Sequence, residues 1–160
     1  MSSHPSTIHA SAVLVGAHAV LIRGPSGSGK SQLAWQLANA APAHMPFARL
    51  VGDDRVFVEA HHGRLIVRPA PELAGLFEIR GLGIHRAWLV CRPADAQAYE
   101  PRAVVGLIVD LAAAGADRLP AQEALRAQVL GITLPRLPVA PSHQALPALL
   151  AVLGTTSASD

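Results

Sequence analysis

The segment Gly24-Pro25-Ser26-Gly27-Ser28-Gly29-Lys30-Ser31 constrains the fold of this chain more than any other part of it. It matches the pattern Gly-x4-Gly-Lys-Ser, in which the glycines let backbone N–H groups turn inward onto phosphates. The lysine of the pattern reaches the β- and γ-phosphates, and the serine hydroxyl can bind Mg²⁺. A strand is expected before such a loop, and a helix after it points its positive end at the anion. The sequence therefore predicts a fold that binds ATP and Mg²⁺ on residues 24–31.

The use of basic residues supports this interpretation. Lys30 is the only lysine in a chain that contains twelve arginines. Lysine presents a compact point charge, whereas arginine presents a wide planar fork. A lysine at this one position is what a tight phosphate loop requires.

The composition is typical of one globular domain. A length of 160 residues suits a single domain, which is expected over residues 1–153 with a disordered tail at 154–160. Hydrophobic residues at 51% and charged residues at 15% exclude a disordered chain. No apolar run reaches the ~20 residues that cross a bilayer, and no membrane association is expected. The single cysteine, Cys91, fits a reducing cytoplasm.

The charge pattern argues against nucleic acid as a partner. The formal net charge is +2, and the arginines are scattered without a run. Aromatic residues make up only 4% of the chain, too few for a base-stacking surface. Neither a basic face nor a stacking platform is predicted.

Apolar periodicity predicts an α/β fold with more strands than an ordinary βαβ array. The expected strands are residues 8–15, 19–23, 48–51, 55–60, 64–68, 77–80, 86–90 and 103–111. The expected helices are residues 30–41, 120–128 and 142–153. In the last of these, Ser142 is the expected cap and Pro147 a weak point. Three prolines in residues 133–141 favour a segment at a sheet edge.

Acidic residues lie where phosphate chemistry would use them. Asp53 and Asp54 follow an expected strand, and carboxylates in such a place beside a phosphate loop commonly hold Mg²⁺ or orient the nucleophile. A solvated turn is the alternative. Glu78 and Arg80 stand among apolar residues, where burial without partners would be costly. A metal or a phosphate would supply those partners, and a surface strand with an ion pair is the alternative.

Two further residues have an ordinary interpretation when taken alone. His9 lies within the first expected strand, and a lone histidine there is usually structural. Arg118 lies on a loop after the long strand, where most arginines are simply solvated, although a loop arginine can stabilise a transferring phosphoryl group.

In combination these clusters resemble the C-terminal catalytic domain of bacterial HPr kinase/phosphorylase, in the short form found in some proteobacteria. The resemblance runs in order from His9 to about Pro141, and residues 76–84 (LFEIRGLGI) are its most specific part. His9 stands 21 residues ahead of Lys30, as in that family. Residues 52–56 (GDDRV) and 117–119 (DRL) are similar to two further segments of the family.

The resemblance implies a protein-serine kinase that phosphorylates the phosphocarrier protein HPr and removes the phosphate by phosphorolysis. It implies a P-loop kinase fold with a mixed, strand-rich sheet, similar to the nucleotide-binding part of phosphoenolpyruvate carboxykinase. It also implies a homo-oligomer, a hexamer in that family. All three are expectations for this chain.

The resemblance also implies a role for each candidate residue. Lys30 and Arg118 would neutralise the moving phosphoryl group. Ser31 and Glu78 would hold Mg²⁺. One aspartate of the pair at 53 and 54, preferably Asp54, would take the proton of the serine, and a histidine, His9, would support the aspartate or the phosphate.

One departure leaves alternatives open. No Lys or Arg follows Arg136, where the family carries a basic stretch linked to dephosphorylation. The carrier protein and the reverse activity are therefore both open. A kinase with another substrate and a non-catalytic ATP-sensing regulator are the two alternatives. The complete set of candidate residues favours an enzyme, because a switch needs neither a proton acceptor nor a catalytic arginine.

Overall fold

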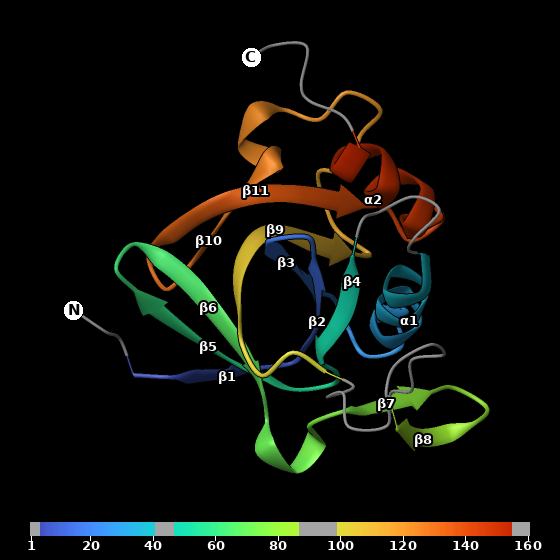
Figure 1. Cartoon of the computed structure of the whole chain (residues 1–160). Coiled ribbons are helices and arrows are strands. Elements are labelled where there is room, and N and C mark those ends of the chain that lie inside the picture. Colours follow the sequence, from blue (N-terminus) through green and yellow to red (C-terminus); the bar gives the residue numbers. More distant parts are fainter. Residues whose placement is uncertain (1–3, 41–46, 87–98, 155–160) are drawn as a thin grey trace.

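The computed structural model describes residues 4–40, 47–86 and 99–154, which form a strand-rich α/β fold (Figure 1). The strands are β1 (Ser6–Ile8), β2 (Ala10–Val15), β3 (His18–Arg23), β4 (Ala48–Gly52), β5 (Val56–His61), β6 (Arg64–Pro69), β7 (Leu76–Ile79), β8 (Gly83–Arg86), β9 (Ala103–Leu111), β10 (Arg126–Val129) and β11 (Ile132–Val139). The helices are α1 (Lys30–Ala40) and α2 (Ala145–Gly154), with two short 3-10 helices, η1 (Pro71–Leu73) and η2 (Gln122–Leu125).

Most of the described strands belong to one mixed sheet. Its order is β1-β5-β6-β9-β3-β2-β4, and β11 joins it along β9 and carries β10. Strands β7 and β8 form a separate hairpin. Because β2 is antiparallel to both β3 and β4, those two strands are parallel to each other, and β9 and β11 run in the same direction. The carboxyl ends of β4, β3, β9 and β11 therefore meet at one edge of the sheet, together with the start of β2.

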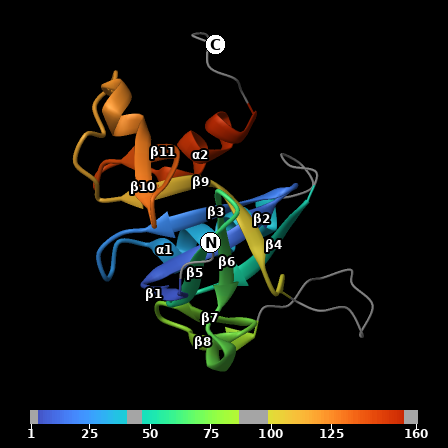
Figure 2. The ribbon, with the colours of Figure 1, turned by 90° about the vertical axis from the view of Figure 1, so that its left-hand side faces the viewer.

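The sheet is covered differently on its two sides. Helices α1 and α2 lie on one side, and β1, β5 and β6 curl over the other (Figures 1 and 2). A hydrophobic cluster lies on each side of the sheet. Helix α1 contributes Leu33 and Leu37 to the cluster on the helix side, and both side chains are buried. Burial of each leucine contributes about 1.5–3 kcal/mol. This packing fixes the start of α1 against the sheet edge.

The local predictions in the N-terminal half are largely confirmed. The expected hairpins appear as β2–β3 and β5–β6, and the helix after the phosphate loop appears as α1. His9 departs from expectation, because it lies at a bend between β1 and β2 rather than within a strand. The expected strand at 86–90 contributes only Arg86, the last residue of β8, and its other residues and Cys91 lie outside the described part. Ala41 also lies outside it, as do residues 155–160 of the tail expected at 154–160, whose first residue, Gly154, instead ends α2.

The predicted helix at 120–128 is wrong. Only Gln122–Leu125 is helical, as η2, and Arg126–Val129 forms β10, which pairs with Ile132–Pro135 of β11. A tight turn at Leu130 and Gly131 joins the two strands, with φ angles of 49° and 78°. Pairing with β11 outweighs the local helical preference.

Near the C-terminus, the expected edge segment is confirmed and the expected helix start is revised. The first half of β11 pairs with β10, and its second half pairs with β9. Among the described strands, each half therefore has a partner on one side only, and proline is accepted where a strand has an unpaired side. Helix α2 begins at Ala145 rather than at Ser142, because the His143 N–H bonds to the Ala140 carbonyl in a preceding turn. Pro147 then falls in the first helical turn, where its missing N–H costs nothing. Neither described helix is long and apolar enough to cross a membrane.

Candidate functional site

The phosphate loop leaves the end of β3 and turns directly into α1. A Cβ on Gly24 would lie 2.6 Å from Ser28 Oγ and 3.0 Å from Leu111 Cβ, and the φ of Gly24 is 156°. Only glycine satisfies both conditions. The loop is therefore closed at its base by contact with the end of β9.

The side chain of Lys30 folds back over the phosphate loop and contacts its first residues. Its Nζ donates to the carbonyl oxygens of Gly24 at 2.9 Å and Pro25 at 3.0 Å. Among the described residues, the buried Ser28 Oγ has no hydrogen-bond partner. A buried unsatisfied hydroxyl costs about 1–3 kcal/mol. The loop thus holds a cation and an unused polar group where the sequence predicts phosphates.

The arrangement of metal-ligating groups fits Mg²⁺ that arrives with a nucleotide. No group of three or more His, Cys, Asp or Glu side chains in the described part could hold a metal ion alone. Magnesium in phosphate sites is usually held by one or two protein side chains together with phosphate oxygens and water. Ser31 in the first turn of α1 and the exposed Glu78 carry oxygen atoms that could serve as ligands of this kind.

The two adjacent aspartates have opposite environments. Asp53 is only 2% exposed, and its carboxylate accepts hydrogen bonds from Ser11 Oγ at 2.5 Å and from the Glu78 N–H at 3.1 Å. Asp54 is exposed and has a φ of 62°. The Arg55 N–H returns to the Asp53 carbonyl at 2.7 Å, which makes the turn tight. One carboxylate is fixed on both oxygens, and its neighbour faces solvent.

Other predicted residues fall at or near the same edge. His9 is exposed and directly precedes Ala10, which pairs with Arg23 at the end of β3. Glu78 shares the edge through its bond to Asp53. Arg118 is exposed on the loop after β9, and no described hydrogen bond or ion pair joins it to the phosphate loop. The phosphate loop, the aspartate pair and the loop that carries Arg118 thus all follow strands that end at one edge of the sheet.

Arg80, for which the sequence offers either a phosphate or metal partner or a surface ion pair, lies close to the phosphate loop. It follows β7, and a Cβ placed on Gly27 would lie 3.6 Å from its guanidinium nitrogen. A second cation therefore lies near the tip of the phosphate loop. Its signal was its place among apolar residues next to Glu78.

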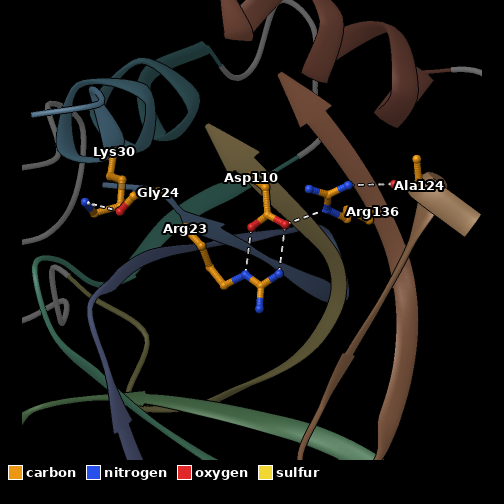
Figure 3. A network of polar contacts seen from close by, with 6 residues as sticks. All are labelled: Arg23, Gly24, Lys30, Asp110, Ala124 and Arg136. Carbon is orange, nitrogen blue, oxygen red and sulfur yellow. Dashed lines mark hydrogen bonds and ion pairs between the residues drawn. The ribbon is translucent and has the colours of Figure 1, made fainter. Parts of the chain in front are cut away.

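A half-buried charge cluster lies on the other side of β3, and the sequence analysis did not predict it. The Asp110 carboxylate accepts from Arg23 Nε at 2.7 Å and Nη2 at 2.8 Å, and from Arg136 Nε at 2.5 Å (Figure 3). Arg136 also donates to the Ala124 carbonyl at 2.9 Å. The cluster ties together the ends of β3 and β9 and the middle of β11. In the sequence, the single carboxylate within the apolar run 103–111 could have indicated this cluster, because such a group needs partners when it is buried.

The charges of this cluster are mutually stabilised. Burial alone would raise the pKa of Asp110, but the hydrogen bonds and positive charges of Arg23 and Arg136 outweigh it, and the pKa lies below its ordinary value. Asp110 is therefore ionised at neutral pH. Through its bonds to Arg23, the last residue of β3, it holds in place the strand that leads into the phosphate loop.

A cleft of about 710 Å³ opens on the β11 side of the phosphate loop. One wall is the loop itself with the first turns of α1. The other is formed by the ends of β9 and β11 and the start of α2. The phosphate loop thus has the aspartates on one side and this cleft on the other.

Comparison with known proteins agrees with this geometry. The HPr Serine kinase C-terminal domain model matches residues 2–152. An HPr kinase/phosphorylase of Geobacillus thermodenitrificans is 37% identical over 147 residues, which cover 87% of this chain and 44% of the relative. One from Streptococcus thermophilus is 42% identical over 80 residues, covering 49% of this chain and 24% of the relative. The chain thus spans less than half the length of these curated relatives.

A solved structure supports the fold. The Hpr(Ser) kinase/phosphatase of Coxiella burnetii superposes with a TM-score of 0.67 at 23% identity, covering 92% of this chain and 93% of that one. At this identity the likeness concerns the fold, and it agrees with the strand-rich sheet described above. Since the family model covers nearly the whole chain, this protein belongs to the HPr serine kinase C-terminal domain family.

Proposed function

We propose that this chain is an ATP-dependent kinase domain that transfers the γ-phosphoryl group to a serine hydroxyl of an HPr-like phosphocarrier protein. Family membership and the names of the relatives support the proposal. The observation that carries it is the pair of adjacent aspartates, one fixed and one exposed, at the same sheet edge as the phosphate loop. Phosphoryl transfer needs a phosphate cradle and a proton acceptor next to each other.

The exposed aspartate is the better proton acceptor. In the proposed step the serine oxygen bonds to the γ-phosphorus, the bond from this phosphorus to the bridging oxygen breaks, and ADP leaves. The serine proton passes to a carboxylate within hydrogen-bond reach. Asp53 uses both of its oxygens in hydrogen bonds, whereas Asp54 faces solvent. We therefore assign the proton to Asp54 and the alignment of the turn to Asp53.

The cations of the site would balance the charge of the moving group. Lys30 and Arg118 take this role in the proposal, and the position of Arg80 near Gly27 supports adding it to them. Ser31 and Glu78 would hold Mg²⁺, which when bound neutralises charge on the phosphates. His9 would support the aspartate or the phosphate from the start of β2.

The experiment is a transfer assay with γ-labelled ATP, Mg²⁺ and an HPr-like protein, run with the carrier intact and with its acceptor serine replaced by alanine. We expect label on the intact carrier alone, and none with the Lys30→Ala variant of this chain. Label on both carriers would show a different acceptor residue. Normal ATP binding without transfer to any carrier would favour the regulatory alternative.

A further inference from the structure

Arg136 connects two parts of the site that are far apart in the sequence. Its Nε donates to the Asp110 carboxylate at 2.5 Å, and its Nη1 donates to the Ala124 carbonyl at 2.9 Å (Figure 3). Asp110 also holds Arg23, which directly precedes the phosphate loop. Ala124 belongs to η2, the first element after residues 112–121, the Arg118 loop. One side chain, only 17% exposed, thus joins the strand before the phosphate loop to the end of the Arg118 loop.

The Arg118 loop is held at its base. The Ala113 N–H donates to the Val139 carbonyl at 3.0 Å, which fixes the start of the loop to the end of β11. Gly115 has a φ of 78°, and a Cβ added there would lie 3.1 Å from the Ala124 Cβ, so the loop packs against η2. The tip of the loop is exposed and takes its position from this base. The guanidinium of Arg136 supplies the bond on the η2 side.

We propose that Arg136 is a positioning residue for phosphoryl transfer, which fixes the Arg118 loop relative to the phosphate loop. The inference rests on the proposed function, because it takes Arg118 as a cation that balances the charge of the moving group. A loop arginine stabilises that charge only when it is held in place, and a displacement of about 1 Å can cost about 100-fold in rate. Two hydrogen bonds of its own hold Arg23 to Asp110, so nucleotide binding should survive changes at Arg136.

The substitution that tests this role is Arg136→Lys. A lysine keeps a positive charge beside Asp110, but one ammonium replaces two diverging nitrogens, so we expect it to lose the Ala124 carbonyl. With labelled ATP and an HPr-like acceptor, both saturating, kcat should fall about ten-fold or more, and the dissociation constant of Mg-ATP from calorimetry should stay within about two-fold. The matched control is Arg49→Lys, because Arg49 is 18% exposed and also binds one carboxylate, that of Glu100. This control should leave kcat unchanged.

A double-mutant cycle separates positioning from a general loss of structure. If Arg136 acts through Arg118, then Arg136→Lys should change kcat by less than about two-fold in a chain that already carries Arg118→Ala. Independent losses that multiply in the double variant would overturn the inference. A loss of Mg-ATP affinity as large as the loss of kcat would also overturn it, since the effect would then act on the phosphate loop.

Hydrogen exchange tests the link between Arg136 and η2 without any activity. The Ala124 N–H bonds to the Ala121 carbonyl at 2.9 Å. This amide should exchange about ten-fold faster or more in Arg136→Lys and at the wild-type rate in Arg49→Lys. Unchanged exchange in Arg136→Lys would overturn the inference even in an active kinase. Faster exchange in a chain whose wild type phosphorylates no carrier would contradict the proposed function, and with it the role in transfer, while the link to η2 would stand.

Discussion

Replacing Asp110 by asparagine should destabilise the fold well beyond an ordinary surface change. The carboxylate holds Arg23 through two hydrogen bonds and Arg136 through a third. An asparagine keeps the shape but retains a single acceptor oxygen and turns an NH₂ group toward a guanidinium. Two cations then share one neutral group where the ends of β3 and β9 meet the middle of β11.

The size of the effect follows from exposure. Breaking a buried ion pair from one side costs roughly 3–5 kcal/mol, and an exposed pair contributes at most about 1 kcal/mol. The side chains of Asp110 and Arg136 are 14% and 17% exposed, and that of Arg23 is 31% exposed. We therefore expect a loss of roughly 2–4 kcal/mol in the free energy of unfolding, and a melting temperature lower by about 4–16 °C for a domain of this size.

Thermal and urea melts of wild type and Asp110→Asn measure this loss, with Glu72→Gln as the matched control. Glu72 pairs with Arg55 at 3.1 Å, but these side chains are 60% and 43% exposed, so its loss should stay below about 1 kcal/mol. Equal effects of the two substitutions would refute the reasoning.

The contribution of Asp110 to the free energy of unfolding should depend on pH in a direction that its pKa determines. The pKa of Asp110 is lower in the folded chain than its ordinary value, because the two arginines favour the ionised carboxylate. Its contribution to stability is therefore present above the unfolded pKa of about 3.9 and is lost as the pH falls through the folded value. The gap between wild type and Asp110→Asn should be constant from neutral pH down to about pH 5 and shrink below about pH 4. A gap as large at pH 3 as at pH 7 would contradict this account.

Substitutions at three further residues test the site. Lys30→Ala should abolish phosphoryl transfer with the fold intact, and Lys30→Arg should also transfer poorly, because a fork does not fit a point-charge site; near-normal turnover of the arginine variant would contradict this. Glu78→Gln should raise the Mg²⁺ concentration for half-maximal activity at fixed ATP, and an unchanged requirement would leave Glu78 a structural role. Ser11→Ala removes a hydrogen-bond donor from the buried Asp53, so it should lower the free energy of unfolding in a urea melt by about 1.5–3 kcal/mol and should also lower turnover. The control Ser142→Ala, at an exposed serine, should change neither quantity. Equal effects of the two substitutions would show that the bond to Asp53 is dispensable.

The parts of the fold that sequence reasoning predicted are those with local causes. The phosphate loop and α1 follow from glycine spacing and an apolar face around Leu33 and Leu37. The β5–β6 hairpin follows from alternation around a turn at His62 and Gly63, whose φ angles are 48° and 75°. Each of these signals spans only a few residues, so a single sequence carries it.

The parts that were missed depend on distant partners. Asp110 meets Arg23 across 87 residues and Arg136 across 26 residues. Ser11 meets Asp53 across 42 residues. Strand β10 exists because β11 lies beside it, and its own residues favour a helix. A single sequence shows that a polar group stands in an apolar strand, but the register of the sheet decides which group satisfies it.

In the proposed function, neighbours in sequence would take separate roles because some acidic side chains at this edge are fixed by hydrogen bonds and others face solvent. Asp53 and Asp110 flank the phosphate loop, and protein donors hold both oxygens of each carboxylate. Such groups align backbone segments, and taking up a proton would cost them those bonds. Asp54, by contrast, is turned to solvent by a φ of 62° directly after Asp53. A tight turn after β4 thus gives two identical side chains different environments, one fixed by hydrogen bonds and one in solvent, which in the proposed function would position the site and take up the proton.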